Sequence, residues 1–365
     1  MNIGILSMQR VINYGSFLQG YALKNYLKDR GHEVSFIDIK QGEQILGDTR
    51  IRENEGIIQK IKQKLDGDLF KKAKRYNLVR ERKRRFEEEF FPILEVGEID
   101  YSTDYDAVVI GSDEVFNCTQ PAPWGFAKTL LGEGIDSDII LSYAASCGFT
   151  TLERVEELNI KDQVEKALSN FDAFSVRDAN TRKFVESLTD KEVYDHIDPT
   201  LIYTFEKELK NVTIDEKDYI LIYAYDDRIS DKNVINETKE FAKKNNLTII
   251  SAGVFQAWAD KNIVCTPFEL LAYFKNATYI LTDTFHGTVF SIKSKVPFAT
   301  IVRDSNNQKL TDLLNKFDLV YRKVNSYTDI SKILKMDIDK ENIDEKISEY
   351  TEKANQYFSK YLDRK

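Results

Sequence analysis

Residues 279–292 read YILTDTFHGTVFSI. A short apolar run, Tyr279 to Leu281, comes first, and a second apolar run, Val289 to Ile292, follows a polar turn. The first run predicts a buried strand and the second a helix, so the segment is typical of a strand-turn-helix unit of an α/β protein. The turn contains His286, and the chain of 365 residues has only 3 histidines.

The same alternation recurs on both sides of this segment. Apolar runs predict strands at residues 3–6, 34–39, 107–110, 139–144 and 173–176, and again at 219–223, 247–250, 279–282 and 298–301. Amphipathic stretches between them indicate helices, and this order favours parallel sheets. Asp198-Pro199-Thr200 interrupts the rhythm and a charged segment follows it, so we place a hinge at 202–217.

The predicted fold class is therefore α/β, with two Rossmann-like domains that face a cleft. The N-terminal domain would cover residues 1–205, with a basic helical insertion at 50–91, and the C-terminal domain residues 215–340. Residues 341–365 predict a C-terminal helix that packs back on the first domain, because Ile343, Ile347 and Tyr350 have helical spacing. Ligands of such domains bind beyond the carboxyl ends of strands, so the polar residues there are the candidates.

Composition narrows the class of protein. The formal charge of -8 argues against nucleic acid as a partner. Cys118, Cys147 and Cys265 are too few and too scattered for a disulfide framework or a zinc site, so we expect neither metal nor cofactor. The N-terminus has no signal-peptide pattern, and no apolar run reaches the roughly 18 residues of a membrane span. We expect a cytoplasmic protein.

One segment is strongly basic. Lysines and arginines crowd residues 71–85, and Glu87, Glu88 and Glu89 follow directly. One interpretation is a solvated helical face whose charge the glutamates offset. The other is a peripheral contact with anionic lipid at the inner membrane face.

Two turns after predicted strands carry polar side chains. Asn13-Tyr14-Gly15-Ser16 opens a helix, and Gly111-Ser112-Asp113-Glu114-Val115-Phe116-Asn117 follows the strand at 107–110. Asp113 could remove a proton from a sugar hydroxyl. Helix capping and an Asx turn are the purely structural interpretations of the two motifs.

Two more strand ends carry charge. Arg177 follows the strand at 173–176, where its guanidinium could bind a carboxylate or phosphate, or pair with Asp178 instead. His286 stands at a helix entrance, where free amides favour anions and an imidazole can exchange a proton near neutral pH. We treat His32 and His196, which lie in connecting turns, as structural.

Together, the segments 13–23, 111–117, 142–148, 175–178, 198–202 and 282–292 resemble the polysaccharide pyruvyl transferase family in order and approximate spacing. The resemblance covers roughly residues 3 to 320, and the ordered set is specific although each motif alone is weak. The sequence departs from the pattern at Glu114, Phe116 and Cys147, where glutamine, tryptophan and an aromatic residue are expected. These departures suggest an altered acceptor.

The resemblance implies domains of the GT-B type, phosphoenolpyruvate as donor, and a sugar or lipid-linked saccharide acceptor in bacterial surface polysaccharide synthesis. We expect the catalytic residues to be His286, Asp113 and Asp283, the donor-binding residues to be Arg177, Gly287, Thr288, Arg303 and Lys309, and the acceptor-binding residues to be Asn13, Tyr14, Gly15, Ser16, Ser112 and Asn117. A homo-oligomer is a reasonable expectation.

Two other functions remain open at this point. A glycosyltransferase that uses a nucleotide sugar could share the architecture and an Asp and His pair. A saccharide-binding protein of the same fold would need no catalytic residues, yet His286 and Asp113 are both present.

Overall fold

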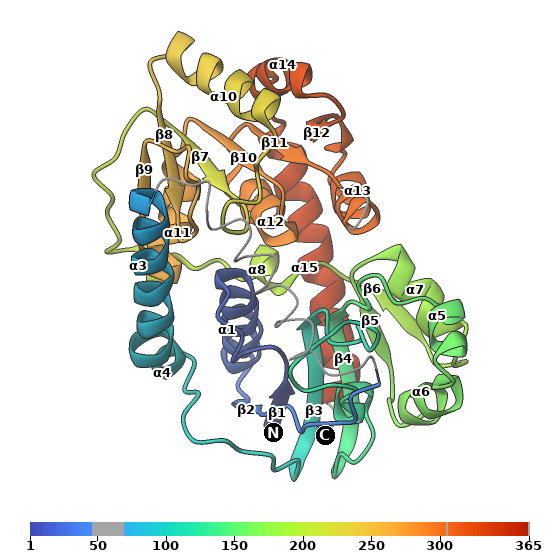
Figure 1. The fold of residues 1–365 in the computed structure, drawn as a ribbon. Coiled ribbons are helices and arrows are strands. Elements are labelled where there is room, and N and C mark those ends of the chain that lie inside the picture. Colours follow the sequence, from blue (N-terminus) through green and yellow to red (C-terminus); the bar gives the residue numbers. More distant parts are fainter. Residues whose placement is uncertain (46–68, 304–305, 364–365) are drawn as a thin grey trace.

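The computed structural model describes residues 1–45, 69–303 and 306–363. Within these ranges the chain forms two six-stranded sheets, which lie in the lower and upper halves of Figure 1. The first sheet contains β1 (Asn2–Leu6), β2 (Glu33–Ile37), β3 (Tyr105–Asp113), β4 (Ser137–Ala145), β5 (Phe174–Val176) and β6 (Val193–Asp195). The second contains β7 (Tyr219–Tyr223), β8 (Thr248–Ala252), β9 (Lys261–Ile263), β10 (Tyr279–Thr282), β11 (Phe298–Ile301) and β12 (Lys323–Val324). Every strand pairing is parallel, which confirms the predicted α/β class.

The order of the strands creates a favoured binding position in each sheet. The orders are β2-β1-β3-β4-β5-β6 and β12-β11-β10-β7-β8-β9. In both sheets the chain first adds strands on one side of the starting strand and then adds the remaining strands on its other side. The order of strand addition therefore reverses between β1 and β3 and between β7 and β10. Loops diverge at such a reversal and leave a crevice beyond the carboxyl ends of the strands.

Helices cover both sheets. They are α1 (Tyr14–Asp29), α3 (Leu69–Arg85), α4 (Phe91–Ile93), α5 (Leu152–Glu157), α6 (Lys161–Leu168), α7 (Ala179–Glu186), α8 (Pro199–Ile202), α9 (Glu206–Leu209), α10 (Lys232–Lys244), α11 (Pro267–Asn276), α12 (Phe285–Ser294), α13 (Asn307–Lys316), α14 (Ile330–Lys335) and α15 (Lys340–Leu362). A π-helical turn, η1 (Phe86–Phe90), follows α3, and short 3-10 turns lie at η2 (Lys128–Leu131), η3 (Val320–Arg322) and η4 (Tyr327–Asp329). None of these described helices is long and apolar enough to cross a membrane.

A continuous hydrophobic core joins the two domains. One cluster includes Phe17 of α1, Leu201 of α8, Phe290 of α12 and Phe358 of α15. Two further clusters cover the other faces of the first and second sheets. Because burial of apolar surface is the main favourable term in folding, the shared cluster holds the two domains against each other.

The last helix confirms the predicted return to the first domain. α15 runs from the second domain down along the first sheet (Figure 1). The Tyr357 hydroxyl donates to the carbonyl of Ser142 in β4 at 2.9 Å, and Arg30 pairs with Asp363 just beyond the helix at 2.7 Å.

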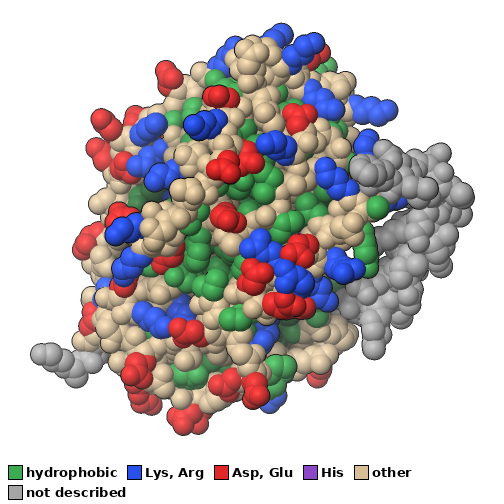
Figure 2. Space-filling view, turned by 90° about the vertical axis from the view of Figure 1, so that its left-hand side faces the viewer, with side chains coloured by type: hydrophobic (Ala, Val, Ile, Leu, Met, Phe, Trp, Pro, Cys, Tyr) green, Lys and Arg blue, Asp and Glu red, His purple; other side chains and the backbone are tan. Residues whose placement is uncertain are grey.

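The basic segment lies partly outside the described residues, because the predicted insertion at 50–91 includes residues 50–68. In the described part, Arg82 of α3 binds the carboxylate of Asp226 in the second domain at 2.7 Å and the carbonyl of Gly253 at 3.1 Å. Arg84 and Arg85 pair with glutamates on their own helical stretch. On the face that carries α3, acidic and basic side chains are interspersed (Figure 2). Ion pairs within the protein therefore neutralise much of the positive charge in the described part of this segment.

Candidate active site

A cavity of about 260 Å³ lies where the two strand-order reversals face each other. From the first domain it is lined by Asn13, Asp113, Glu114, Phe149 and Arg177. The second domain contributes, among others, Tyr225, Arg228, His286, Asn306 and Lys309. These residues lie at or after the carboxyl ends of β1, β3, β4, β5, β7, β10 and β11. The cavity is therefore lined by residues from the strand ends of both sheets.

His286 reaches the cavity from the first turn of α12. The Thr284 side chain caps this helix by accepting from the amide of Gly287 at 2.8 Å. The imidazole lies against the backbone of α1, where a methyl group on Gly15 would be only 2.2 Å from Nδ1 of His286. Gly15 is therefore required by the close approach of the ring.

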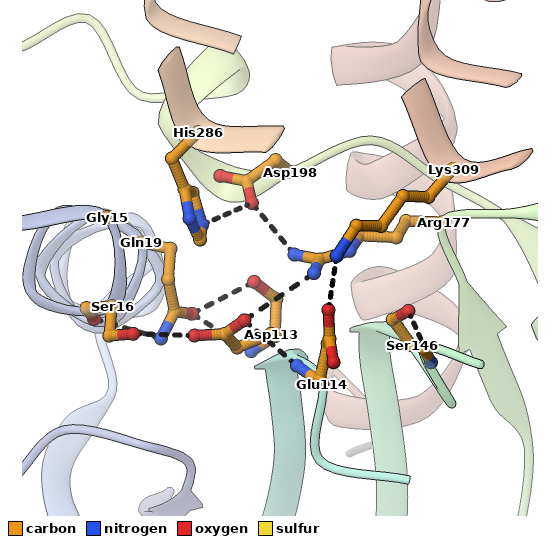
Figure 3. Close-up of polar contacts among 12 residues, drawn as sticks. Gly15, Ser16, Gln19, Asp113, Glu114, Ser146, Arg177, Asp198, His286 and Lys309 are labelled. Carbon is orange, nitrogen blue, oxygen red and sulfur yellow. Dashed lines mark hydrogen bonds and ion pairs between the residues drawn. The ribbon is translucent and has the colours of Figure 1, made fainter. Parts of the chain in front are cut away.

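A chain of alternating charges connects His286 to the first domain (Figure 3). Nε2 of His286 lies 3.5 Å from a carboxylate oxygen of Asp198, and Arg177 donates to that same oxygen at 3.2 Å. Arg177 also lies 3.5 Å from Asp113. Asp113 in turn accepts from the Ser16 hydroxyl at 2.7 Å.

The two carboxylates are kept ionised although they are buried. Burial by itself would raise the pKa of Asp113, but the charges of His286 and Arg177 outweigh it and hold that pKa below its usual value. Burial likewise opposes the ionisation of Asp198, and its contacts with His286 and Arg177 again bring the pKa down. Asp113 also has a φ of 77°, a strained conformation for a residue with a side chain.

A second set of charges lines the side of the cavity that the second domain forms. Lys309 of α13 donates to the carboxylate of Glu114, which bridges the two domains. Arg228 stacks on the ring of Tyr225 at 4.2 Å, and Asp283 holds its guanidinium at 2.7 Å. Arg228 and Lys309 therefore present positive charge close to Arg177.

Several predicted donor-site and catalytic residues do not line this cavity. Asp283 is fully buried beneath Arg228 and Arg303, each 2.7 Å from the same carboxylate oxygen, so it anchors the arginines and does not face a substrate. The amides of Gly287 and Thr288 are already bonded to the side chain and carbonyl of Thr284. The described amides ahead of them in α12, those of Phe285 and His286, have no such partner, because the first amides of a helix lack one.

Most predicted acceptor residues also support the cavity from behind. The exception is Asn13, which lines the cavity while its side chain caps α1. Tyr14 donates to the carbonyl of Cys265, Ser112 bonds Gln19, and Asn117 bonds Glu114 and Thr150. Gly15 and Ser16 act through His286 and Asp113, as described above. The two motifs at 13–16 and 111–117 therefore lie close to the site and mainly support it.

Asp198, Arg228, Phe149 and Tyr225 are residues to which the sequence analysis assigned no role. Arg228 and Tyr225 follow the strand at 219–223, so the strand-end rule could have found them. Asp198 follows the three-residue strand β6. The sequence feature that could have identified it is its helix-capping position before Pro199 and Thr200. His196, by contrast, is buried against Ser175, and burial lowers its pKa to about 4, which fits a structural role.

A larger hollow of about 750 Å³ lies between α8, α12 and α15. It is lined by apolar side chains such as Leu201 and Phe290. Its half-buried Lys293 donates to the carbonyl of Tyr203 at 2.6 Å, and loss of hydration lowers the pKa of this lysine to about 8. None of the residues predicted for catalysis or substrate binding lines this hollow, so the smaller cavity is the candidate active site.

The close packing of Gly15 against His286 leads to a prediction. In Gly15→Ala the new methyl group must push the imidazole away, and a displacement of about 1 Å can lower a rate by about 100-fold. The measurement is the kcat/KM of the variant, compared with that of the unchanged protein. Gly20→Ala on the same helix is the matched control, because its methyl group would meet Phe36 at an ordinary 3.4 Å. Equal activity of the two variants would contradict this role of Gly15.

The two parallel sheets with the charged cavity between them form a two-domain α/β fold of the GT-B type. A glycosyltransferase of kitacinnamycin aligns over 98% of this chain and 98% of its own, at 10% identity and a TM-score of 0.50. UDP-GlcNAc 2-epimerase from Neisseria meningitidis, bound to UDP-GlcNAc, aligns over 98% and 93%, at 10% identity and a TM-score of 0.48. At 10% identity, the likeness to the glycosyltransferase speaks for the fold alone. No curated protein matches the chain.

The family itself is identified by sequence. The model of the polysaccharide pyruvyl transferase family matches residues 13–305, a range that begins at the cap of α1. The chain belongs to the polysaccharide pyruvyl transferase family. It is accordingly a transferase enzyme, as the motifs predicted.

Proposed function

We propose that this protein transfers the pyruvyl group of phosphoenolpyruvate to two hydroxyls of one sugar, in a precursor of a bacterial surface polysaccharide. The observation that carries the proposal is the cavity in which His286 meets Arg177, Arg228 and Lys309. Family membership supports pyruvyl transfer to a saccharide. The choice of phosphoenolpyruvate rests on the match between its two anionic groups and these cations.

The donor would bind through its carboxylate and phosphate. Arg177 and Arg228 offer planar guanidinium groups, which suit bidentate contacts with such anions. Lys309 of α13 adds a positive charge, for which its ammonium group would exchange its partner Glu114 for the phosphate. The free amides at the start of α12 lie beside His286 and favour an anion through the helix dipole.

His286 would then protonate the methylene carbon of the donor. This step makes C2 an oxocarbenium-like centre, which one acceptor hydroxyl attacks while it loses its proton. The bond between C2 and the phosphate oxygen breaks next, and the phosphate leaves with the bonding electron pair. The second hydroxyl attacks C2 and loses its proton, which closes the ketal. Two hydroxyl protons are released in all. The first, which Asp113 accepts, passes on to the leaving phosphate, and the second restores His286.

Asp113 is the proposed acceptor of the first hydroxyl proton. Its carboxylate lines the cavity beside Arg177. The nearby positive charges keep its pKa low, which makes it a weak base in the empty site. A bound donor adds negative charge next to Arg177. This charge raises the pKa of Asp113, so the carboxylate becomes a better acceptor for the hydroxyl proton.

Two aromatic side chains at the cavity are suited to the sugar. Phe149 is 56% exposed and Tyr225 is 52% exposed, although both line the cavity. Large exposed aromatic rings are costly to leave in water, and the apolar face of a sugar ring can cover them. We therefore place the acceptor between Phe149 and Tyr225, with its hydroxyls towards Asp113.

This placement predicts a selective effect of Phe149→Ala. Loss of the ring should raise KM for the acceptor about tenfold, equivalent to about 1.4 kcal/mol, with little change in KM for phosphoenolpyruvate. Phe149→Trp should restore it. Tyr101→Ala is the control, because Tyr101 is 53% exposed and does not line the cavity. An unchanged acceptor KM in Phe149→Ala would remove this ring from the acceptor site.

Ligand-dependent thermal unfolding tests the function as a whole. A ligand at about 100 times its dissociation constant adds about 2.7 kcal/mol to stability, so phosphoenolpyruvate should raise the unfolding temperature measurably. Nucleotide sugars are the comparison, because they are donors of glycosyltransferases. Stabilisation by nucleotides alone would contradict the proposed donor. Mass spectrometry of a galactose-containing saccharide, treated with enzyme and phosphoenolpyruvate, should detect the added group.

A further inference from the structure

The carboxylate of Asp198 has a divided role in the structure. This residue precedes α8 in the segment that joins the two sheets, and its side chain is completely buried. One oxygen accepts from the amide and the hydroxyl of Thr200, at 3.0 Å and 2.7 Å, which caps the helix. The other oxygen faces Arg177 and His286 at 3.2 Å and 3.5 Å. Capping therefore uses only half of this carboxylate.

We propose that Asp198 is the positioning residue that aims His286 at the cavity, and that it also holds Arg177 beside it. The proposal rests on the proposed function, in which His286 is the proton donor. Asp198 does not line the cavity and would not touch the substrate. It acts through the two residues that do.

The groups around the imidazole explain why Asp198 is decisive. Asp198 and Asp113 favour the charged ring, whereas Arg177 and the positive end of α12 oppose it. From α1 the ring meets the backbone of Gly15, which carries no net charge. The Asp113 carboxylate is bonded to Ser16 and lies beside Arg177, whereas an oxygen of Asp198 lies 3.5 Å from Nε2 of His286.

The direct test follows the imidazole itself by NMR. Since the chain has only 3 histidines, three ring signals are expected, and His286→Gln identifies the relevant one. In Asp198→Asn, which keeps an oxygen to cap α8, the titration midpoint of His286 should fall by about one pH unit or more. The basic limb of the kcat profile should move to lower pH by the same amount.

Asp178→Asn is the matched control. Asp178 is also a buried capping aspartate that binds the amide and hydroxyl of a threonine, Thr181, but it has no contact with His286. This variant should leave the midpoint of His286 in place. If Asp198→Asn does not fold, Asp198→Ser provides a second helix cap without the charge.

The outcomes separate this inference from the proposed function. An unchanged midpoint in a folded Asp198 variant, or an equal shift in Asp178→Asn, would overturn the role of Asp198. A shifted midpoint with an unmoved kcat profile would overturn its part in catalysis. A wild-type protein that never releases phosphate from phosphoenolpyruvate would instead remove the proposed function, while the NMR result would still report on the contact between Asp198 and His286.

Discussion

Replacement of His286 by alanine is expected to lower phosphate release from phosphoenolpyruvate, in the presence of acceptor, by about 100-fold to 10,000-fold. This is the usual contribution of a positioned acid or base to a rate. The imidazole lies at the cavity, is held between Gly15 and Asp198, and stands at the start of α12. Imidazole is the side chain that ordinarily exchanges a proton near neutral pH, and His286 is the histidine that lines the cavity.

Controls must separate lost chemistry from lost structure. His286→Gln fills a similar space without a titratable ring, so its rate should fall about as far as that of His286→Ala. Both variants should still bind phosphoenolpyruvate, which thermal shift can measure, because the proposed donor contacts are those of Arg177, Arg228 and Lys309. Near-normal turnover in either variant would exclude His286 as the acid.

Arg177→Ala is expected to have the second large effect, on donor binding. The Arg177 guanidinium lines the cavity, and Phe285 packs against it with the ring centre 4.1 Å away. Loss of a charged hydrogen-bonding partner from such a site costs about 2–5 kcal/mol of binding energy. The dissociation constant for phosphoenolpyruvate should therefore rise at least tenfold, and calorimetric titration below the unfolding temperature measures it. Unchanged affinity would place the donor elsewhere.

The same change should also destabilise the fold. Arg177→Ala leaves Asp113 and Asp198 buried without their shared cation, and breaking a buried ion pair in this way costs about 3–5 kcal/mol. Arg154→Ala is the control, because Arg154 pairs with Glu157 on the surface, where such pairs contribute about 0–1 kcal/mol. Chemical denaturation of both variants gives the comparison. A similar loss in both would contradict the assigned network.

Much of the fold could be predicted from local pattern. The nine predicted strands all correspond to strands of the two sheets, although their ends differ by a few residues. Three strands were missed, namely β6, β9 and β12, which have only two or three residues. A run that short does not establish an alternating or apolar pattern, and its identity as a strand comes from pairing with a neighbour.

The candidate site could be predicted only to the level of its neighbourhood. The strand-end rule led to Asp113, Arg177 and His286, all of which line the cavity. It also selected Asp283, which lies at a strand end but points into two arginines. The direction of a side chain at such a turn depends on which partner is available, and that partner comes from another part of the chain.

The sequence by itself therefore determined the alternation of strands and helices, the family, and the presence of polar groups beyond the strands of both domains. These features depend on residues that are neighbours along the chain. Only the tertiary structure decided which of these groups meet. Ser16 and Asp113 are 97 positions apart, and Asp198 joins Arg177 of one domain to His286 of the other. A buried charge is tolerated only with a partner, and these partners come from distant parts of the chain. A local sequence pattern contains neither burial nor distant contacts. Only the tertiary structure therefore shows which groups face the cavity and which support it.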